Sequence, residues 1–214
     1  MADHDNIWIF GYGSLMWDPG VPILRSQTAR LRGYHPTFSI LSGGSWGTTE
    51  SPGLALGLHH GGSCVGRALE IASHHRDEAL EILDRRESAY LRISVQLELS
   101  LEESPVSSQL TLTGTKPRSR GGYNVGIAAQ TYLADPNHQR YAGHLSAAER
   151  DRLITTGAGH KGRSLEYLHR TVAELEKMNV RGSMHRLLSE INTAGISDDR
   201  SGGRPDLLES GKVK

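Results

Sequence analysis

The sequence predicts an α+β domain in which a small, mixed, barrel-like sheet carries flanking helices. Short apolar runs of strand character fill most of the chain up to residue 133, and helical apolar spacing is concentrated after residue 146. Strands first and helices late favour this class over a wound parallel sheet. About seven strands are enough for a sheet to curl into a barrel. The 25 glycines among 214 residues exceed the usual ~7%, as expected of many tight turns.

The first strand is expected over residues 7–10, four apolar residues that are β-branched or aromatic. Directly after it lies the glycine loop, residues 11–15, with the sequence Gly-Tyr-Gly-Ser-Leu. A strand that runs into such a loop points successive backbone N–H groups at one spot, which suits a carboxylate or phosphate oxygen. An ordinary turn at the end of a strand is the alternative interpretation of the same residues.

The known glycine-loop motifs do not fit this stretch. The dinucleotide fingerprint requires a third glycine where Met16 stands, and a Walker loop requires a Gly-Lys-Ser/Thr that is missing here. The nucleophile elbow requires Gly-x-Ser-x-Gly, and neither flank of Ser14 provides it. The loop therefore predicts anion binding without a nucleotide signature, and no spacing makes Ser14 a nucleophile.

Further strands are expected where apolar residues run together or alternate. The expected segments are residues 31–41, 54–60, 64–71, 91–99, 109–113 and 127–133. Gly61-Gly62 separates two of these runs and predicts a hairpin. Between Leu91 and Leu99 every second residue is apolar, which is the period of a half-buried strand.

An early helix is expected over residues 74–86, with Ser73 as its N-cap. Leu80 and Leu83 lie on one stripe of this helix and face the core, and Glu87 falls on the same stripe. Partial desolvation and the negative end of the helix dipole would both raise the pKa of Glu87. A carboxylate with a raised pKa can act as a general base near neutral pH.

The alternative for Glu87 is an ordinary residue at the end of a helix. In that interpretation its carboxylate pairs with a nearby arginine, for which Arg85, Arg86 and Arg92 are available.

Three more helices are expected in the last third of the chain. Ser146 and Glu149 form a capping box, and Gly157 marks the end of that helix. Ser164 begins a longer helix, and residues 184–195 form the last one. One domain is expected over residues 1–196, since no internal repeat argues for two. Residues 197–214 are charged, rich in glycine and poor in apolar residues, which predicts a disordered tail.

Composition limits the partners that we expect. Acidic and basic residues balance at 24 each, so there is no electrostatic case for nucleic acid or an anionic membrane. The single cysteine, Cys64, excludes an intrachain disulfide framework and favours a reducing compartment. The polar start and the short apolar run after it do not read as a signal peptide. We therefore expect a cytoplasmic protein that binds neither nucleic acid nor membranes.

Several motifs together resemble those of the ChaC-like γ-glutamylcyclotransferases. The glycine loop with its flanks, Trp-Ile-Phe-Gly-Tyr-Gly-Ser-Leu-Met-Trp followed by Pro19-Gly20, resembles the signature of that family. Further matching pieces arrive in the family's order: Arg32-Gly33-Tyr34-His35, residues 47–58, Arg85-Arg86-Glu87, Tyr141-Ala142-Gly143 and residues 162–168. The resemblance spans roughly the first nine-tenths of the chain and implies the γ-glutamylcyclotransferase-like fold.

The resemblance also implies a reaction. Enzymes of this family cut the γ-glutamyl amide of glutathione when the substrate's own α-amine attacks its γ-carbonyl, releasing 5-oxoproline and cysteinylglycine. The family's catalytic glutamate occupies the place of Glu87, which would take a proton from the α-ammonium and give one to the leaving amine. No cofactor and no enzyme nucleophile are required.

Candidate binding residues follow from the same comparison. The backbone N–H groups of Tyr12, Gly13, Ser14 and Leu15 would hold γ-glutamyl oxygens and steady the developing negative charge. Tyr90, three residues after Glu87, is placed to hold Glu87 or the substrate.

Other tyrosines are weaker candidates. Tyr141 is a candidate for the same role, with a packed core tyrosine as the alternative. Tyr34 and Tyr167 are interpreted as structural.

The chain departs from the family at three points. Trp46-Gly47-Thr48-Thr49 stands where many relatives have Arg-Gly-Thr-Pro, so a basic residue is lost from a loop that borders the expected site. The segment after Glu87 is a short version of a longer loop. Ser164 replaces a frequent asparagine, and both residue types cap helices.

The 11 histidines show no metal-ligand spacing. Neither His-Glu-x-x-His, Cys-x-x-Cys nor His-x₃-His is present, so we expect no metal.

Two alternatives to glutathione cleavage remain open at this point. One is a cyclotransferase for another γ-glutamyl amine or amino acid, and the other is a non-catalytic domain that binds a γ-glutamyl or other carboxylate ligand. The second alternative leaves a buried carboxylate at residue 87 without a purpose, which is costly.

Overall fold

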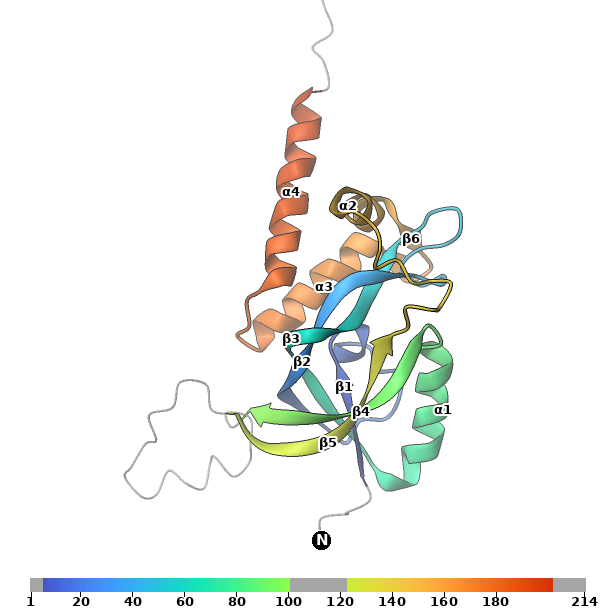
Figure 1. Ribbon diagram of the computed structural model, residues 1–214, viewed down its shortest axis with the longest axis vertical. Coiled ribbons are helices and arrows are strands. Elements are labelled where there is room, and N and C mark those ends of the chain that lie inside the picture. Colours follow the sequence, from blue (N-terminus) through green and yellow to red (C-terminus); the bar gives the residue numbers. More distant parts are fainter. Residues whose placement is uncertain (1–5, 101–122, 202–214) are drawn as a thin grey trace, which may run out of the picture.

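The computed structural model describes residues 6–100 and 123–201. Five strands close into a barrel in the order β1-β3-β2-β4-β5. The strands are β1 (Ile7–Gly11), β2 (Arg25–Leu41), β3 (Leu54–Ile71), β4 (Tyr90–Ser100) and β5 (Tyr123–Ala134). The neighbours in this order are antiparallel, and β5 closes the barrel through short parallel pairings with β1 and β3. The predicted α+β class and barrel-like sheet are confirmed (Figure 1).

The hairpin predicted at Gly61-Gly62 is wrong. β3 continues through both glycines and pairs with β2 on either side of them. Gly61 and Gly62 have φ values of +99° and +71°, and Gly33 on the facing strand has +80°. The register shifts at this point, between Arg32 and Tyr34. The three glycines therefore form an irregularity inside a long strand pair, which is the other common meaning of glycine within a strand.

The alternation predicted for β4 is present but unevenly buried. Val95 and Leu97 are buried inside the barrel, whereas Leu91 is 47% exposed near the start of the strand. The strand predicted over residues 109–113 lies outside the described residues.

Four α-helices flank the barrel. They are α1 (Arg76–Arg86), α2 (Ala147–Thr156), α3 (Ser164–Lys177) and α4 (Ser183–Ser201). The capping box of α2 is confirmed, since Ser146 and Glu149 exchange both of its hydrogen bonds, and Gly157 is the C-cap. The cap predicted for the first helix is wrong. A short 3₁₀ turn, η2 (Ser73–His75), precedes α1, and His75 rather than Ser73 occupies the N-cap of α1.

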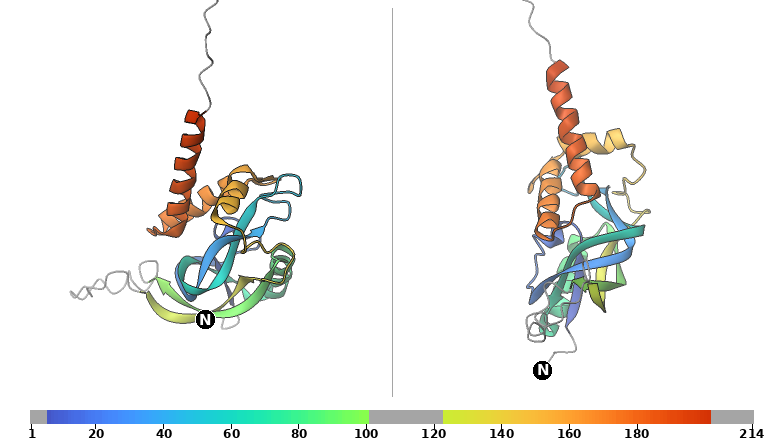
Figure 2. Two further views of the ribbon diagram at one scale, coloured as in Figure 1. Left: turned by 45° about the horizontal axis from the view of Figure 1, so that its top comes forward. Right: turned by 90° about the vertical axis from the view of Figure 1, so that its left-hand side faces the viewer.

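The last helix runs further than predicted. α4 passes through Gly195 and ends at Ser201, because an isolated glycine lowers helix propensity without stopping a helix. Residues 197–201, predicted to belong to a tail, are therefore helical, and residues 202–214 lie outside the described part. In both views of Figure 2, α4 projects away from the barrel. In Figure 1, α1 lies beside the barrel at the lower right, away from α4.

Two hydrophobic clusters anchor the elements that position the site. The larger fills the barrel and joins it to α3, with Phe10, Leu54 and Leu168 among its fully buried members. The smaller packs α1 on the barrel through Ala79 and Leu83. Both clusters meet the stretch that follows β1, so the glycine loop is held from two sides.

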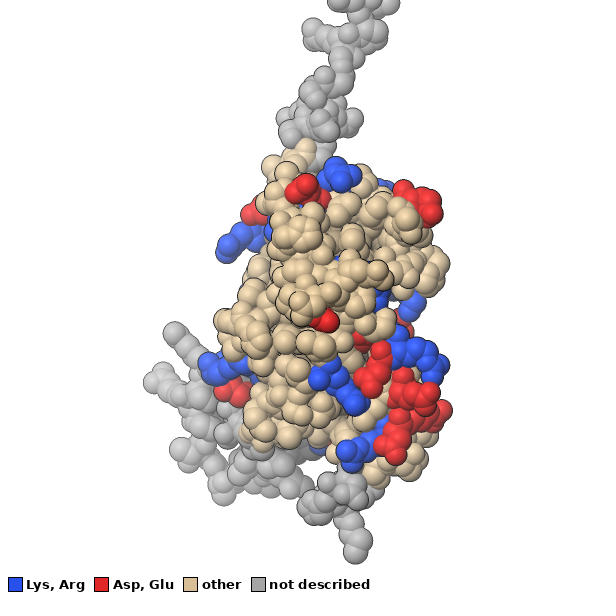
Figure 3. Space-filling view, turned by 45° about the vertical axis from the view of Figure 1, so that its right-hand side comes forward, with Lys and Arg blue, Asp and Glu red and all other residues tan. Residues whose placement is uncertain are grey.

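The remaining short elements lie near that loop. A 3₁₀ turn, η1 (Ser14–Met16), follows β1, and a two-stranded sheet joins β6 (Ala158–Gly159) to β7 (Gly162–Arg163). No helix in the described ranges is both long and apolar enough to span a membrane. Acidic and basic side chains are interspersed on the face seen in Figure 3.

Candidate functional site

A cavity opens where the glycine loop, the turn between α1 and β4, and the loop after β2 come together. All but one of the predicted site residues line it: Tyr12, Gly13, Ser14, Leu15, Glu87 and Tyr90. The glycine loop follows β1, which the barrel holds in place, and Glu87 directly follows the last residue of α1. Residues far apart in the sequence are thereby brought to one place.

Glu87 is the C-cap residue of α1. Its N–H donates to the Leu83 carbonyl at 2.8 Å, and its own carbonyl accepts from the Tyr90 N–H at 2.9 Å. This tight turn holds the side chain at 13% exposure. Burial raises the pKa of Glu87 above its usual value, and the positive charges of Arg86, Arg140 and Lys161 oppose that rise. The raised pKa expected from the sequence is present, with desolvation as its main cause.

The arginine pairing considered as the alternative for Glu87 also exists. Arg86 Nε lies 3.2 Å from Glu87 Oε1, whereas Arg85 pairs with Glu81 and Arg92 with Asp84. The pairing and the position in the cavity are therefore compatible, because Arg86 itself lines the cavity.

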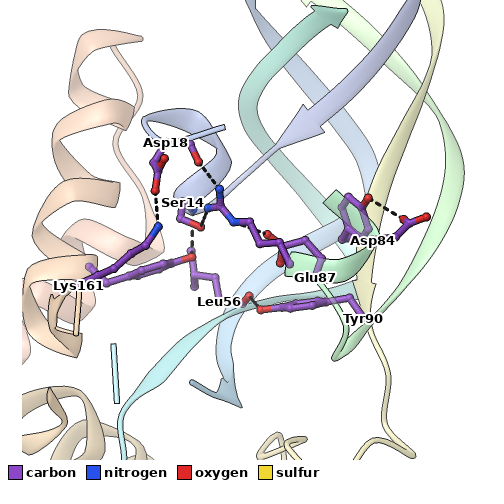
Figure 4. A network of polar contacts seen from close by, with 10 residues as sticks. Ser14, Asp18, Leu56, Asp84, Glu87, Tyr90 and Lys161 are labelled. Atoms are coloured by element: carbon purple, nitrogen blue, oxygen red, sulfur yellow. Dashed lines mark hydrogen bonds and ion pairs between the residues drawn. The ribbon is translucent and has the colours of Figure 1, made fainter. Parts of the chain in front are cut away.

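Arg86 connects Glu87 to the glycine loop. Its Nη1 donates to the Asp18 carbonyl at 2.6 Å, and its Nη2 donates to Ser14 Oγ at 2.9 Å. Figure 4 shows the polar contacts that lie between Ser14 and Asp18 on one side and Glu87 on the other. Charge-assisted hydrogen bonds of this kind fix geometry more strongly than neutral ones. Motion of the loop relative to Glu87 is thus restrained by one side chain.

Position 13 requires a glycine because the Tyr167 hydroxyl group lies too close for a side chain. Its φ is −135°, outside the left-handed region. A Cβ at this position would overlap the hydroxyl oxygen of Tyr167. The neighbouring Ser14 N–H donates to that same oxygen at 3.2 Å. One of the four backbone amides expected to face a ligand is therefore already engaged by a side chain.

Tyr167, interpreted as structural from the sequence, lines the cavity. Burial is the main cause that raises its pKa, and the charge of Glu87 adds to the effect. Its oxygen accepts from Ser14, and its own hydrogen has no acceptor within residues 6–100 and 123–201. Tyr167 is thus a protonated phenol with a free donor at the cavity. Its place at the start of α3 gave no sequence signal for this position.

Two other tyrosines near Glu87 use their hydroxyl groups on the backbone. Tyr90 donates to the Leu56 carbonyl at 2.9 Å, and Tyr12 donates to the Tyr132 carbonyl at 2.7 Å. Burial raises the pKa of both well above the usual value. Tyr90 therefore supports the wall of the cavity and does not hold Glu87 in this structure.

Tyr141 is the predicted site residue that does not line the cavity. It packs beside Ile40, Ala89 and Ala134, and its ring lies 5.9 Å from that of His59. This is the packed position considered as the alternative for this residue.

Trp46 and Lys161 were not predicted as site residues. Trp46 is 5% exposed, lines the cavity and meets Tyr167 edge-on at 5.5 Å. The residue at which the sequence was expected to depart from the family thus lies in the wall of the cavity. Lys161 places another cation there. Its N–H donates to the Ser45 carbonyl at 2.8 Å, and its Nζ pairs with Asp18 Oδ2 at 2.7 Å.

Among the described residues, no three His, Cys, Asp or Glu side chains gather in a way that would hold a metal ion.

Comparison with known proteins identifies the family. A model described as ChaC-like protein matches residues 7–194. A glutathione-specific gamma-glutamylcyclotransferase of Escherichia coli (strain K12) is 30% identical over 205 residues, which cover 91% of this chain and 79% of the relative. A glutathione-specific gamma-glutamylcyclotransferase 1 of Danio rerio is 29% identical over 175 residues, 79% of each chain. The crystal structure of a γ-glutamyl cyclotransferase specific to glutathione from yeast superposes with a TM-score of 0.74 at 20% identity, covering 89% of this chain and 97% of that one. This chain belongs to the ChaC-like family.

Proposed function

We propose that this protein is a γ-glutamylcyclotransferase that converts glutathione to 5-oxoproline and cysteinylglycine. The observation that carries the proposal is Glu87, a buried carboxylate with a raised pKa that faces a cavity beside the glycine loop. Family membership and the names of the relatives from Escherichia coli and Danio rerio support the substrate.

The reaction moves protons from the attacking amine to the leaving amine, and Glu87 can carry them. The substrate α-ammonium first gives a proton to the Glu87 carboxylate, which frees the nitrogen lone pair to attack the γ-carbonyl carbon. A five-membered ring forms, and the bond from the γ-carbon to the cysteinyl nitrogen breaks. Glu87 then gives this proton to the leaving amine. The ring nitrogen still carries one proton more than the lactam of 5-oxoproline, and the Glu87 carboxylate takes that proton and passes it to the cysteinyl amine, which leaves as an ammonium group. A raised pKa suits a carboxyl group that must accept and release a proton in one cycle.

The oxygen of the γ-carbonyl becomes negative during the attack and needs donors. We assign this role to the Tyr167 hydroxyl together with the amides of the glycine loop. Tyr167 accepts from Ser14 N–H, and this bond makes its own hydrogen a better donor by polarising the hydroxyl. A fixed donor aimed at developing charge lowers the barrier without reorganisation.

Ring closure also requires that the substrate chain be folded. In the proposed complex the γ-glutamyl group lies between the glycine loop and the aromatic side chains of Trp46 and Tyr167, which line the cavity. Holding the amine near the carbonyl converts the attack into a step of high effective molarity. No metal or cofactor takes part in this mechanism, and we expect activity to survive dialysis against EDTA. We also expect the protein to act in the cytoplasm, where Cys64 stays a thiol; burial raises its pKa to about 12.

The test is to incubate the purified protein with glutathione and, separately, with γ-glutamyl-alanine, and to measure 5-oxoproline. The proposal predicts 5-oxoproline and cysteinylglycine from glutathione. Product from γ-glutamyl-alanine but none from glutathione would favour the alternative substrate. Binding of either compound without product would favour the non-catalytic domain.

A further inference from the structure

Three basic side chains line the cavity around Glu87, and they differ in their partners. Arg86 pairs with Glu87 at 3.2 Å, and Lys161 pairs with Asp18 at 2.7 Å. Arg140 forms no ion pair with a carboxylate of residues 6–100 and 123–201, although its charge acts on the pKa of Glu87 from a distance. An arginine that lines a cavity without an acidic partner is suited to receive an anion from the ligand.

The head of Arg140 is held in place by neutral contacts. Its Nη2 donates to Ser88 Oγ at 2.9 Å, and its own backbone carbonyl accepts from the Leu41 N–H at 2.8 Å. The guanidinium lies so close to Gly43 that a Cβ on that residue would overlap Nη1. A guanidinium carries five N–H donors, and Ser88 occupies only one of them. The side chain is thus fixed while most of its donors stay available.

Glutathione brings two carboxylates to this cavity. The α-carboxylate is bonded to the same carbon as the amine that Glu87 must deprotonate, so it stays beside Glu87 and the glycine loop. The glycyl carboxylate belongs to the leaving part, and the two residues of that part span at most ~7 Å when extended. It therefore needs a cation supplied by elements other than the glycine loop. Arg140 comes from the connection between β5 and α2 and contacts the loop after β2.

On the basis of the proposed function, we propose that Arg140 is a specificity-determining residue that binds the C-terminal carboxylate of the tripeptide substrate. Two parallel N–H···O bonds from one guanidinium would hold that carboxylate in a single plane. The protein then favours substrates whose leaving group carries a carboxylate on its second residue, as cysteinylglycine does.

The test compares glutathione with glutathione ethyl ester, in which the glycyl carboxylate is masked and the γ-glutamyl amide is unchanged. The wild-type protein should prefer glutathione in kcat/KM by about 10-fold to 100-fold, the range for a hydrogen bond to a charged group. Arg140→Gln should lower kcat/KM for glutathione by this factor more than for the ester, because any effect of the lost charge on the pKa of Glu87 acts on both substrates alike. Arg140→Lys keeps the positive charge but lacks the planar guanidinium, so its kcat/KM for glutathione should lie between those of the wild-type and Arg140→Gln proteins. Arg85→Gln, an exposed arginine outside the cavity, is the matched control and should keep the wild-type preference.

Two outcomes would overturn this role while the proposed function stands. One is a wild-type protein that uses glutathione and the ester equally well. The other is an Arg140→Gln variant whose kcat/KM falls by one factor on both substrates, which would mean that Arg140 only supports Ser88 and the turn beside it.

Binding separates this inference from the proposed function. Calorimetry with glutathione on the Glu87→Gln protein measures affinity without turnover. Weaker binding after adding Arg140→Gln supports the inference, and equal binding of glutathione and its ester contradicts it. If no 5-oxoproline forms from glutathione with the wild-type protein, the proposed function fails, and this calorimetric comparison still decides whether Arg140 binds the carboxylate.

Discussion

Two glycine-rich stretches of this chain look alike in the sequence and differ in the structure. At the glycine loop, Gly13 has an ordinary negative φ but has no room for a side chain, because the Tyr167 hydroxyl fills that space. At Gly61 in β3, φ is +99° while no atom lies within 4 Å of the position of a Cβ. One glycine serves contact between the loop and α3, and the other serves the bend of a strand. The two glycines are thus needed for different reasons, Gly13 because a neighbouring side chain occupies the space of a Cβ and Gly61 because of its positive φ.

The largest effect is expected from Gly13→Val. The branched side chain would push Tyr167 and the Ser14 amide apart, so activity should fall by at least ~100-fold, since a small misplacement at a reacting centre has effects of this size. Ser14→Ala is the control, because it keeps the backbone and removes only the acceptor of Arg86 Nη2. Its loss should be smaller, about 1.5 kcal/mol for a hydrogen bond to a charged group. A dead Ser14→Ala beside an active Gly13→Val, measured with glutathione, would contradict the role of the loop.

Tyr167→Phe separates the hydroxyl from the ring. The ring contacts with Trp17, Phe38 and Trp46 remain, so the fold should be kept. Loss of one donor to the developing oxyanion should lower kcat by roughly 100-fold, with a smaller effect on KM.

The Tyr167→Phe variant also vacates the space that a Cβ on Gly13 would need. Gly13→Ala should therefore destabilise the wild-type protein more than the Tyr167→Phe protein, and equal destabilisation in thermal melts would argue against close approach as the reason for Gly13.

Gly61→Ala tests the other side of the comparison. An L-residue held at this positive φ should destabilise the fold by about 1–2 kcal/mol, seen as a lower midpoint in urea. Activity per folded molecule should stay within about twofold, because surface positions far from a site have small effects. A strong loss of turnover at an unchanged midpoint would show that β3 shapes the cavity through this bend.

The smallest effect concerns stability against pH. The pKa of Glu87 is raised in the folded protein, so the fold favours the neutral form of this carboxyl. The contribution of Glu87 to stability is therefore greatest below its unfolded pKa and is lost as pH rises through the folded pKa. Relative to Glu87→Gln, the wild-type protein should lose stability across that window in melts from pH 4 to pH 8. A constant difference would show that the carboxylate is not desolvated.

Much of the fold and part of the site followed from the sequence. The period of two in β4 and the capping box at Ser146 are local signals, and each was interpreted correctly. A loop follows β1 as expected, and its role in binding an anion stays a prediction. The hairpin at Gly61-Gly62 was wrong because the same dipeptide marks a bulge when long strands pair on both sides of it. The end of α4 was wrong because Gly195 is tolerated inside a helix.

The site residues that the sequence missed come together only through tertiary structure. Glu87 had a helical stripe and a motif to single it out. Tyr167 and Arg140 are separated from the glycine loop by more than a hundred residues, and no spacing links them to it. The closed barrel and α3 bring them to the cavity, so a structure was needed to find them.

The most direct test of the proposed mechanism is the rate of 5-oxoproline formation from glutathione by the wild-type and Glu87→Gln proteins. Glutamine keeps the shape of the side chain and its hydrogen bonding but cannot take a proton from the α-ammonium. Turnover should fall by at least ~100-fold, the size of lost general-base catalysis, while circular dichroism shows an unchanged fold. Near-normal turnover in Glu87→Gln would contradict the assignment of Glu87 as the general acid and base.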